Sequence, residues 1–177
     1  VKYKVPLFQR PYIWNEKKNW TEFVDDILDV SRKLIETPKD TRKHFLGAIV
    51  LQLESKAIGE QDKAIIIDGQ QRLITSQLFI SALRDVARKF NEENNLLGNT
   101  INYLDKLLLN DYTQNIDIKA KNDIDTYKKL KVQPTQTDRT TFQIALTAKS
   151  PKNLFNLLGK RADSKKTDEN ISDCYLF

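Results

Sequence analysis

The sequence predicts an α/β protein, built as a small mixed sheet flanked by helices. Near-continuous apolar runs at residues 45–53 and 64–68 are typical of central strands. Apolar residues recur at three- and four-residue spacing over residues 16–35 and 71–90, which predicts two long helices that each bury one face. Because strand and helix patterns alternate along the chain, the two kinds of element are expected to pack on each other.

The first residues are predicted to form little regular structure. Residues 5–8 alternate weakly and are interrupted by Pro6 and Pro11, so they predict at most a short edge strand followed by a fixed turn. Asn15 is predicted to cap the helix over residues 16–35.

The remaining elements follow from periodicity and from helix start signals. Residues 54–63 and 91–99 are predicted as loops, residues 101–112 as a helix and residues 130–132 as a short strand. Thr137 or Asp138 is predicted to cap a helix that ends at Ala148.

One domain is expected over residues 1–148. Residues 149–169 are rich in Lys and Arg with little periodicity and predict a mobile basic loop, and residues 170–177 predict the start of a following helical region. The chain starts at Val1 and contains no Met, so we expect it to be part of a longer reading frame.

Composition restricts the function further. The 177 residues are 40% hydrophobic and 30% charged, which is typical of a soluble globular domain. No apolar run reaches the length of a membrane span, so the protein is expected to be cytoplasmic, with no membrane partner. The net charge of +5 favours polyanions but lacks the density of a dedicated DNA-binding stripe.

The counts of cysteine and histidine exclude zinc chemistry. Cys174 is the single Cys and His44 the single His, whereas a zinc site usually takes three or four such ligands. The same count excludes a His-Asn-His nuclease site within this chain. Cys174 is expected to be a small buried apolar residue and His44 a structural one.

The stretch AIIIDGQQRLIT, residues 64–75, passes from a strand pattern directly into a helix pattern. The free N–H groups and positive dipole end of such a helix point at one spot beyond the sheet, which suits phosphate. Gly69 allows a close backbone approach, and Arg72 adds a guanidinium that can hold two phosphate oxygens. The alternative, a hairpin turn at Asp68 with Arg72 on the surface, fits the following helical pattern less well.

The polar residues of this junction indicate hydrolysis. Asp68 would repel phosphate without a cation between them, so it indicates either a Mg²⁺-bound nucleotide or a protonatable catalytic carboxylate. Gln70 and Gln71 could orient a water or a phosphoryl oxygen without adding charge. No glycine of the chain fits the pattern GxxxxGK[ST], so a P-loop is excluded.

A second cluster, VPLFQRPYIW at residues 5–14, sets aromatic side chains around Gln9 and Arg10. Aromatic rings beside arginine suit base stacking together with phosphate binding. An arm whose rings fill the core explains the same composition, so both interpretations stay open.

Five stretches, in this order over residues 3–147, resemble the N-terminal domain of GmrSD-type restriction endonucleases: FQRPYIW, HFLGAIVLQ, IIDGQQRLIT, KLKVQP and DRTTFQIAL. The resemblance implies a ParB/sulfiredoxin-like fold and hydrolysis of a nucleoside triphosphate. It also implies phage defence, in which this hydrolysis permits cleavage of modified DNA by a C-terminal His-Asn-His nuclease domain. HFLG departs from the commoner Tyr-Phe-Leu-Gly, which leaves the role of His44 open.

Pattern and resemblance together indicate two sets of site residues. The catalytic set is Asp68, Gln70, Gln71 and Arg72, with Asp68 as either a Mg²⁺ ligand or the base that positions the attacking water. The nucleotide-binding set is Gln9, Arg10, Gly47, Gly69, Gln71 and Arg72, and in it the guanidinium groups of Arg10 and Arg72 are predicted to converge on one anion.

Two alternative functions remain. In the first, the same residues form a non-catalytic sensor that holds a DNA phosphate or a modified base. In the second, the domain is itself a ParB-like nuclease. This ranks last, because the sequence offers Asp68 but no second metal-binding carboxylate in a matching motif.

Overall fold

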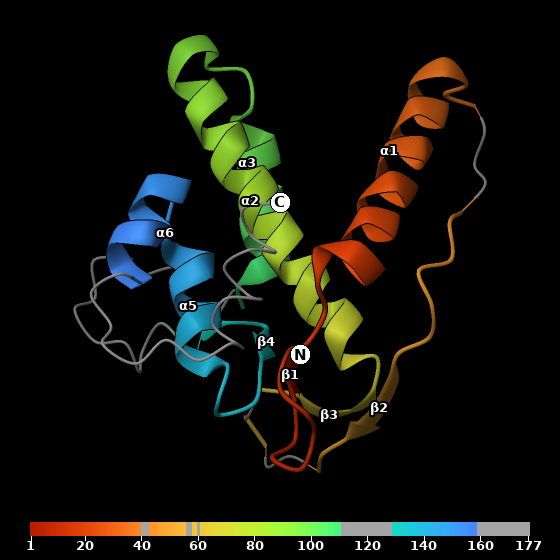
Figure 1. Cartoon of the computed structure of the whole chain (residues 1–177), viewed down its shortest axis with the longest axis vertical. Coiled ribbons are helices and arrows are strands. Elements are labelled where there is room, and N and C mark those ends of the chain that lie inside the picture. Colours follow the sequence, from red (N-terminus) through yellow and green to blue (C-terminus); the bar gives the residue numbers. More distant parts are fainter. Residues whose placement is uncertain (40–42, 56–57, 60, 111–128, 159–177) are drawn as a thin grey trace.

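The computed structural model describes residues 1–39, 43–55, 58–59, 61–110 and 129–158. The strands gather at one end of the molecule and the helices extend away from them (Figure 1). None of the helices in these ranges is both long and apolar enough to cross a membrane.

A four-stranded mixed sheet has the order β2-β3-β1-β4. Its strands are β1 (Lys2–Lys4), β2 (Val50–Leu53), β3 (Lys63–Asp68) and β4 (Val132–Gln133). Strand β1 is parallel to both β3 and β4, and β2 is antiparallel to β3. The mixed sheet and the interior position of β3 confirm the predictions.

The prediction for the N-terminal strand was wrong in both its residues and its position. Strand β1 comprises Lys2–Lys4 rather than residues 5–8, and it lies between β3 and β4 rather than at an edge. The last ladder contact on this side is the Val5 N–H, which donates to the Gln133 carbonyl at 2.9 Å. Pro6 has no N–H to continue the ladder, so the strand ends before it.

The apolar run at residues 45–53 is also not a central strand. Only Val50–Leu53 is strand, it lies at the sheet edge, and all four of its residues are exposed. The residues before Val50 do not extend the strand but pass over Gly69, which separates β3 from the helix that follows it. The Ala48 carbonyl lies 3.0 Å from the position that a Cβ on Gly69 would occupy. The apolar run at residues 45–53 therefore packs partly on the junction at Gly69. Its composition alone does not distinguish such a segment from a core strand.

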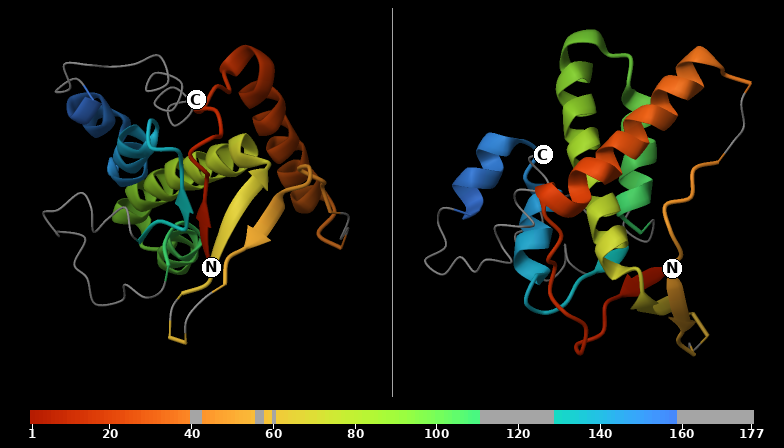
Figure 2. Two further views of the ribbon diagram at one scale, coloured as in Figure 1. Left: turned by 90° about the horizontal axis from the view of Figure 1, so that it is seen from below. Right: turned by 45° about the vertical axis from the view of Figure 1, so that its right-hand side comes forward.

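The first long helix is confirmed from Glu16 onward, although its first turn is not α-helical. A π-helical turn, η1 (Glu16–Trp20), continues into α1 (Thr21–Glu36). The side chain of Asn15 does not cap it. Only Phe23 of α1 is buried, and most of the helix stands away from α2 (Figures 1 and 2), so the buried face is confined to its beginning.

Helix α2 (Gln70–Asn94) confirms the strongest helical prediction and is longer than expected. It ends at Asn95, which adopts the left-handed conformation with φ 50°. The Leu97 N–H donates to the Asn91 Oδ1 at 2.6 Å, and α3 (Gly98–Leu108) follows at once. The loop predicted over residues 91–99 is therefore much shorter, because polar residues that a helix exposes to water give no local signal of an ending.

The C-terminal part contains β4 and two helices, α5 (Arg139–Thr147) and α6 (Pro151–Leu158). Asp138 is the N-cap residue of α5 as predicted, but its carboxylate makes no capping hydrogen bond. Helix α6 contradicts the basic loop predicted from residue 149, and Leu154 within it is buried in the core. The predictions for Tyr112, Cys174 and residues 159–177 fall outside the described residues.

The core forms where α2, α5 and the sheet meet, and the N-terminal arm enters it through Tyr12. This ring is fully buried, and its hydroxyl lies 2.6 Å from the Thr75 Oγ1 and accepts a hydrogen bond from the Trp20 Nε1 at 3.0 Å. Phe8 in the same arm is 80% exposed. One ring of the arm therefore fills the core, and another faces solvent.

Tyr12→Phe is expected to lower the free energy of unfolding by about 1–3 kcal/mol, because it removes the buried hydroxyl that joins Thr75 and Trp20. Urea unfolding followed by circular dichroism measures the change. Tyr103→Phe is the control, since Tyr103 is 62% exposed and its replacement should change stability by less than about 0.5 kcal/mol. Equal losses in both variants would contradict a structural role for the Tyr12 hydroxyl.

Candidate functional site

The candidate site is the junction between β3 and α2. Strand β3 ends at Asp68 and α2 begins at Gln70, with Gly69 between them in the left-handed conformation, φ 88°. A side chain at Gly69 would be strained by this φ and would also meet the Ala48 carbonyl at 3.0 Å. The predicted strand-to-helix junction is confirmed, and the alternative of a hairpin turn at Asp68 is wrong.

No side chain caps the first turn of α2. The first N–H groups of a helix have no partner within it, and together with the helix dipole they favour an anion at this end. Since α2 is 25 residues long, its dipole is fully developed. The end of β3 and the beginning of α2 therefore offer an anion both backbone donors and a favourable field.

Gln70 and Gln71 attach the N-terminal arm to this junction. The Gln70 Nε2 donates to the carbonyl of Arg10 at 2.9 Å, and the Gln71 Nε2 donates to the carbonyl of Pro11 at 3.1 Å. In return, the N–H of Ile13 donates to the Gln71 Oε1 at 2.9 Å. The amide of Gln71 is thus occupied by the arm, a contact that the sequence pattern did not reveal.

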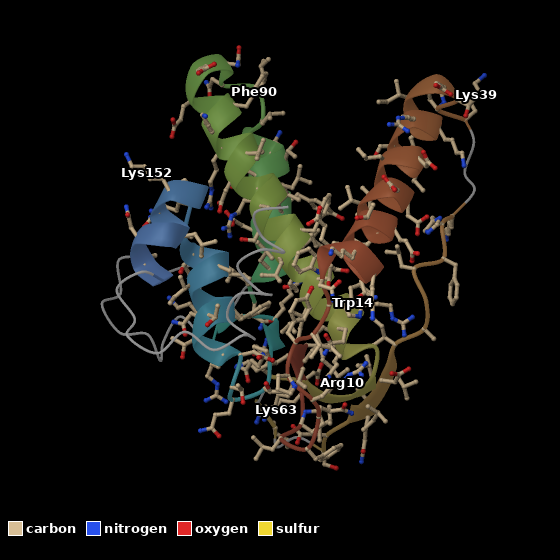
Figure 3. All side chains as sticks on the ribbon, in the orientation of Figure 1. Arg10, Trp14, Lys39, Lys63, Phe90 and Lys152 are labelled. Atoms are coloured by element: carbon tan, nitrogen blue, oxygen red, sulfur yellow. The ribbon has the colours of Figure 1, made fainter. Side chains whose placement is uncertain are left out.

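The Gln9 side chain makes a further contact of the same kind. Its Nε2 donates to the carbonyl of Ile67, the second-last residue of β3, at 3.0 Å. Arg10 lies where the arm passes the beginning of α2, and its side chain is exposed (Figure 3). The two motifs noted in the sequence therefore lie against each other. The convergence of the Arg10 and Arg72 guanidinium groups stays a prediction.

Gly47 and Arg72 are in direct contact. A Cβ built on Gly47 would stand 1.6 Å from the Arg72 Nη1 and 2.8 Å from its Cζ. Gly47 has φ 98°, so its conformation also favours glycine. The segment over residues 43–49 thus presents bare backbone to the Arg72 guanidinium. The resemblance included Gly47 in the site, but no local pattern explained why a glycine stands there.

Arg72 also pairs with Asp68 one helical turn away. The Arg72 Nη2 lies 3.8 Å from the Asp68 Oδ2, and the two side chains are 31% and 71% exposed. A pair this exposed contributes little stability. Asp68 is therefore an accessible carboxylate that stands beside a guanidinium at the mouth of the junction.

The Oε1 of Gln70 is buried and accepts no hydrogen bond in the part of the chain that the structure describes. Gln70 itself is 6% exposed. An unsatisfied buried acceptor costs about 1–3 kcal/mol, so such atoms call for a donor from water or a ligand. This acceptor belongs to the first residue of α2, where a donor from water or a ligand would satisfy it.

The residues at the junction fit one mode of Mg²⁺ binding. Among the described residues, no three His, Cys, Asp or Glu side chains gather into a metal-binding cluster. Mg²⁺ bound with a nucleotide needs only one or two carboxylates, because phosphate oxygens and waters complete its shell. Asp68 suits this mode of binding, whereas the described residues around it do not form a metal site made of protein ligands alone.

His44 has a structural contact. Its Nε2 lies 3.2 Å from the Oδ2 of Asp26 in α1, and it begins the segment that reaches Gly47. This contact connects the segment to α1 at a half-exposed position and agrees with the structural role expected for a lone histidine.

The chain is an α/β domain whose strand-to-helix junction combines a left-handed glycine, an uncapped helix start, a guanidinium and an accessible carboxylate. The model of a known family, the N-terminal domain of GmrSD restriction endonucleases, matches residues 1–176, and the chain belongs to this family. A search of curated proteins found no match. The family connects the chain with an enzyme class that hydrolyses DNA, as the resemblance in the sequence implied.

Proposed function

We propose that this domain binds and hydrolyses a nucleoside triphosphate at the junction of β3 and α2, and that hydrolysis controls cleavage of modified DNA by a restriction endonuclease. The observation that carries the proposal is the meeting of three distant segments at the junction of β3 and α2. These are the arm with Gln9 and Arg10, the backbone at Gly47, and the beginning of α2.

In this proposal the first turn of α2 and the Arg72 guanidinium bind the terminal phosphates. Contact with Gly47 limits the rotamers open to Arg72, so less side-chain freedom is lost when a phosphate binds. Arg10 supplies further positive charge from the arm. Asp68 positions the attacking water or holds the metal ion. Bound Mg²⁺ would neutralise charge on the phosphate oxygens.

The role proposed for the glutamines differs between the two. Gln71 maintains the arm in place through both amide atoms. Gln70 uses its Nε2 for the arm and keeps its Oε1 for a donor, such as a ligand hydroxyl or the attacking water. Nuclease chemistry of the His-Asn-His kind is assigned to a separate domain, since this chain contains a single histidine.

Isothermal titration with ATP and GTP, with and without Mg²⁺, tests binding directly, and Gly47→Ala is the informative variant. Its Cβ would displace the Arg72 guanidinium, so affinity is expected to fall about ten-fold or more, the value of one charge-assisted hydrogen bond. Gly59→Ala is the matched control. Gly59 has a similar φ of 88°, but no described atom lies within 4 Å of its Cβ position, so only backbone strain is shared.

Absence of nucleotide binding by the parental chain under all four conditions would overturn the proposal. Equal affinity for nucleotide in the Gly47 and Gly59 variants would remove Arg72 from the binding site.

One observation favours a second candidate, a non-catalytic sensor of DNA. Phe8 is 80% exposed in the same arm as the exposed Arg10, and such a ring is available to stack on a base. DNA binding that weakens steeply with salt, ignores added nucleotide and is lost in Phe8→Ala would favour the sensor. The third candidate, a nuclease in this domain, gains no support, since the described residues contain no carboxylate cluster.

A further inference from the structure

A cavity of about 470 Å³ lies among α2, α3, α5 and the segment that precedes β4. Helices α3 and α5 both pack against α2 (Figure 1). Arg84, on its wall, is twelve residues beyond Arg72, about 18 Å along α2 at 1.5 Å per residue. The cavity is therefore separate from the junction of β3 and α2.

The floor of the cavity is apolar. Leu108, Leu130 and Leu146 line it, and each of them is at most 3% exposed. Ile101 and Leu109 also contribute to the lining. A concave apolar surface of this volume matches the pockets that proteins use for small organic ligands.

The two arginines on the cavity wall, Arg84 and Arg88, already pair with carboxylates. The Arg84 Nε lies 2.9 Å from the Asp85 Oδ1, and the Arg88 Nη2 lies 2.8 Å from the Asp105 Oδ2. The Arg84 Nη2 also donates to the Leu146 carbonyl at 2.8 Å. Two arginines and two aspartates balance each other here, so these guanidinium groups are structural and not free to bind a ligand.

Lys129 is different, because it lines the cavity, is only 8% exposed, and its ammonium makes no hydrogen bond or ion pair with any residue described. An ammonium on the wall of a largely apolar cavity is stabilised by an anion beside it. Lys149 adds a second cation from the residues after α5, in a left-handed conformation with φ 65° that is uncommon for lysine. Glu92 is the exposed carboxylate on the same wall.

We propose that this cavity is a second binding site, for a small organic anion with an apolar body. The acidic group pairs with the ammonium groups of Lys129 and Lys149, and the apolar body lies on Leu108, Leu130 and Leu146. The acidic group is a phosphate or a carboxylate, since both pair with ammonium in the same way. Binding here does not depend on the nucleotide site, because the two share no residue.

NMR titration of the ¹⁵N-labelled chain tests the site with two probes, 1-naphthyl phosphate and 1-naphthoate, which carry the same ring and distinguish the two acidic groups. Shifts are expected at Leu108, Leu130 and Thr147, which line the cavity. Lys129→Gln is expected to lower the affinity for the tighter-binding probe about ten-fold, since it removes a charge-assisted contact. Lys149→Gln should weaken binding of the probe as well. Because Lys149 is exposed, this substitution should leave the fold intact.

The controls separate this site from the junction and from simple apolar binding. Lys89→Gln changes an exposed lysine of α2 outside the cavity, and Arg72→Ala changes the junction, so neither should alter the affinity for the probe. Unchanged affinity in both the Lys129 and Lys149 variants would overturn the proposal. Equal binding of neutral 1-naphthalenemethanol, or shifts confined to other surfaces, would overturn it too.

Discussion

Asp68→Ala is expected to lower the kcat of nucleotide hydrolysis by about 100-fold or more in the enzyme that carries this domain, the usual effect of losing a group that positions or deprotonates the attacking water. The fold should remain intact, because the Asp68 side chain is 71% exposed and its ion pair with Arg72 is long, at 3.8 Å. Steady-state kinetics with Mg²⁺ and the preferred triphosphate provide the measurement.

Arg72→Ala gives the informative contrast. Its guanidinium would bind phosphate in both the ground state and the transition state, so its loss should raise KM more than it lowers kcat. Asp29→Ala, an exposed aspartate of α1, is the control that should leave both parameters unchanged. An Asp68→Ala enzyme that hydrolyses at the parental rate would exclude this carboxylate from the mechanism and leave the DNA sensor as the better interpretation.

Asp85→Ala is expected to lower the free energy of unfolding by about 3–5 kcal/mol. Asp85 and Arg84 are buried, with side chains 4% and 5% exposed, and their ion pair measures 2.9 Å. Removal of the carboxylate would leave the Arg84 charge buried with weaker compensation, since the Asp105 Oδ1 is 3.5 Å away. Chemical denaturation measures the loss.

The matched control is the exposed pair between Asp29 and Arg32, at 3.1 Å with side chains 61% and 67% exposed. Asp29→Ala should cost less than about 1 kcal/mol, because solvent screens an exposed pair and the side chains lose entropy to form it. Similar losses for Asp85→Ala and Asp29→Ala would show that burial does not set the strength of the Arg84 pair.

Local patterns predicted the elements that local interactions determine. Strand β3, the glycine at residue 69 and helix α2 follow one another in the sequence, so periodicity and backbone freedom at Gly69 were sufficient to identify the junction. The same reasoning failed for residues 45–53, because an apolar run does not reveal whether it covers a core or a neighbouring junction. The edge position of β2 depends on pairing with β3 alone, which only the folded chain defines.

The contacts that complete the site are long-range. Gln9 and Ile67 are 58 residues apart, and Gln70 and Arg10 are 60 apart. A glutamine in a first helical turn suggests a polar contact but not its partner, so its link to the arm could not be predicted. The burial of Lys129 could not be predicted from the sequence either, because it depends on how α2, α3 and α5 pack around this residue.

The glutamines of the junction recognise the arm through its peptide groups. Gln70 and Gln71 bind the carbonyls of Arg10 and Pro11 and the N–H of Ile13, and none of these contacts involves a side chain of the arm. The attachment therefore does not depend on which side chain residue 10 or 13 carries. Substitutions at residues 10 and 13 can therefore change the side chains that the arm exposes to solvent while these three hydrogen bonds to the glutamines persist.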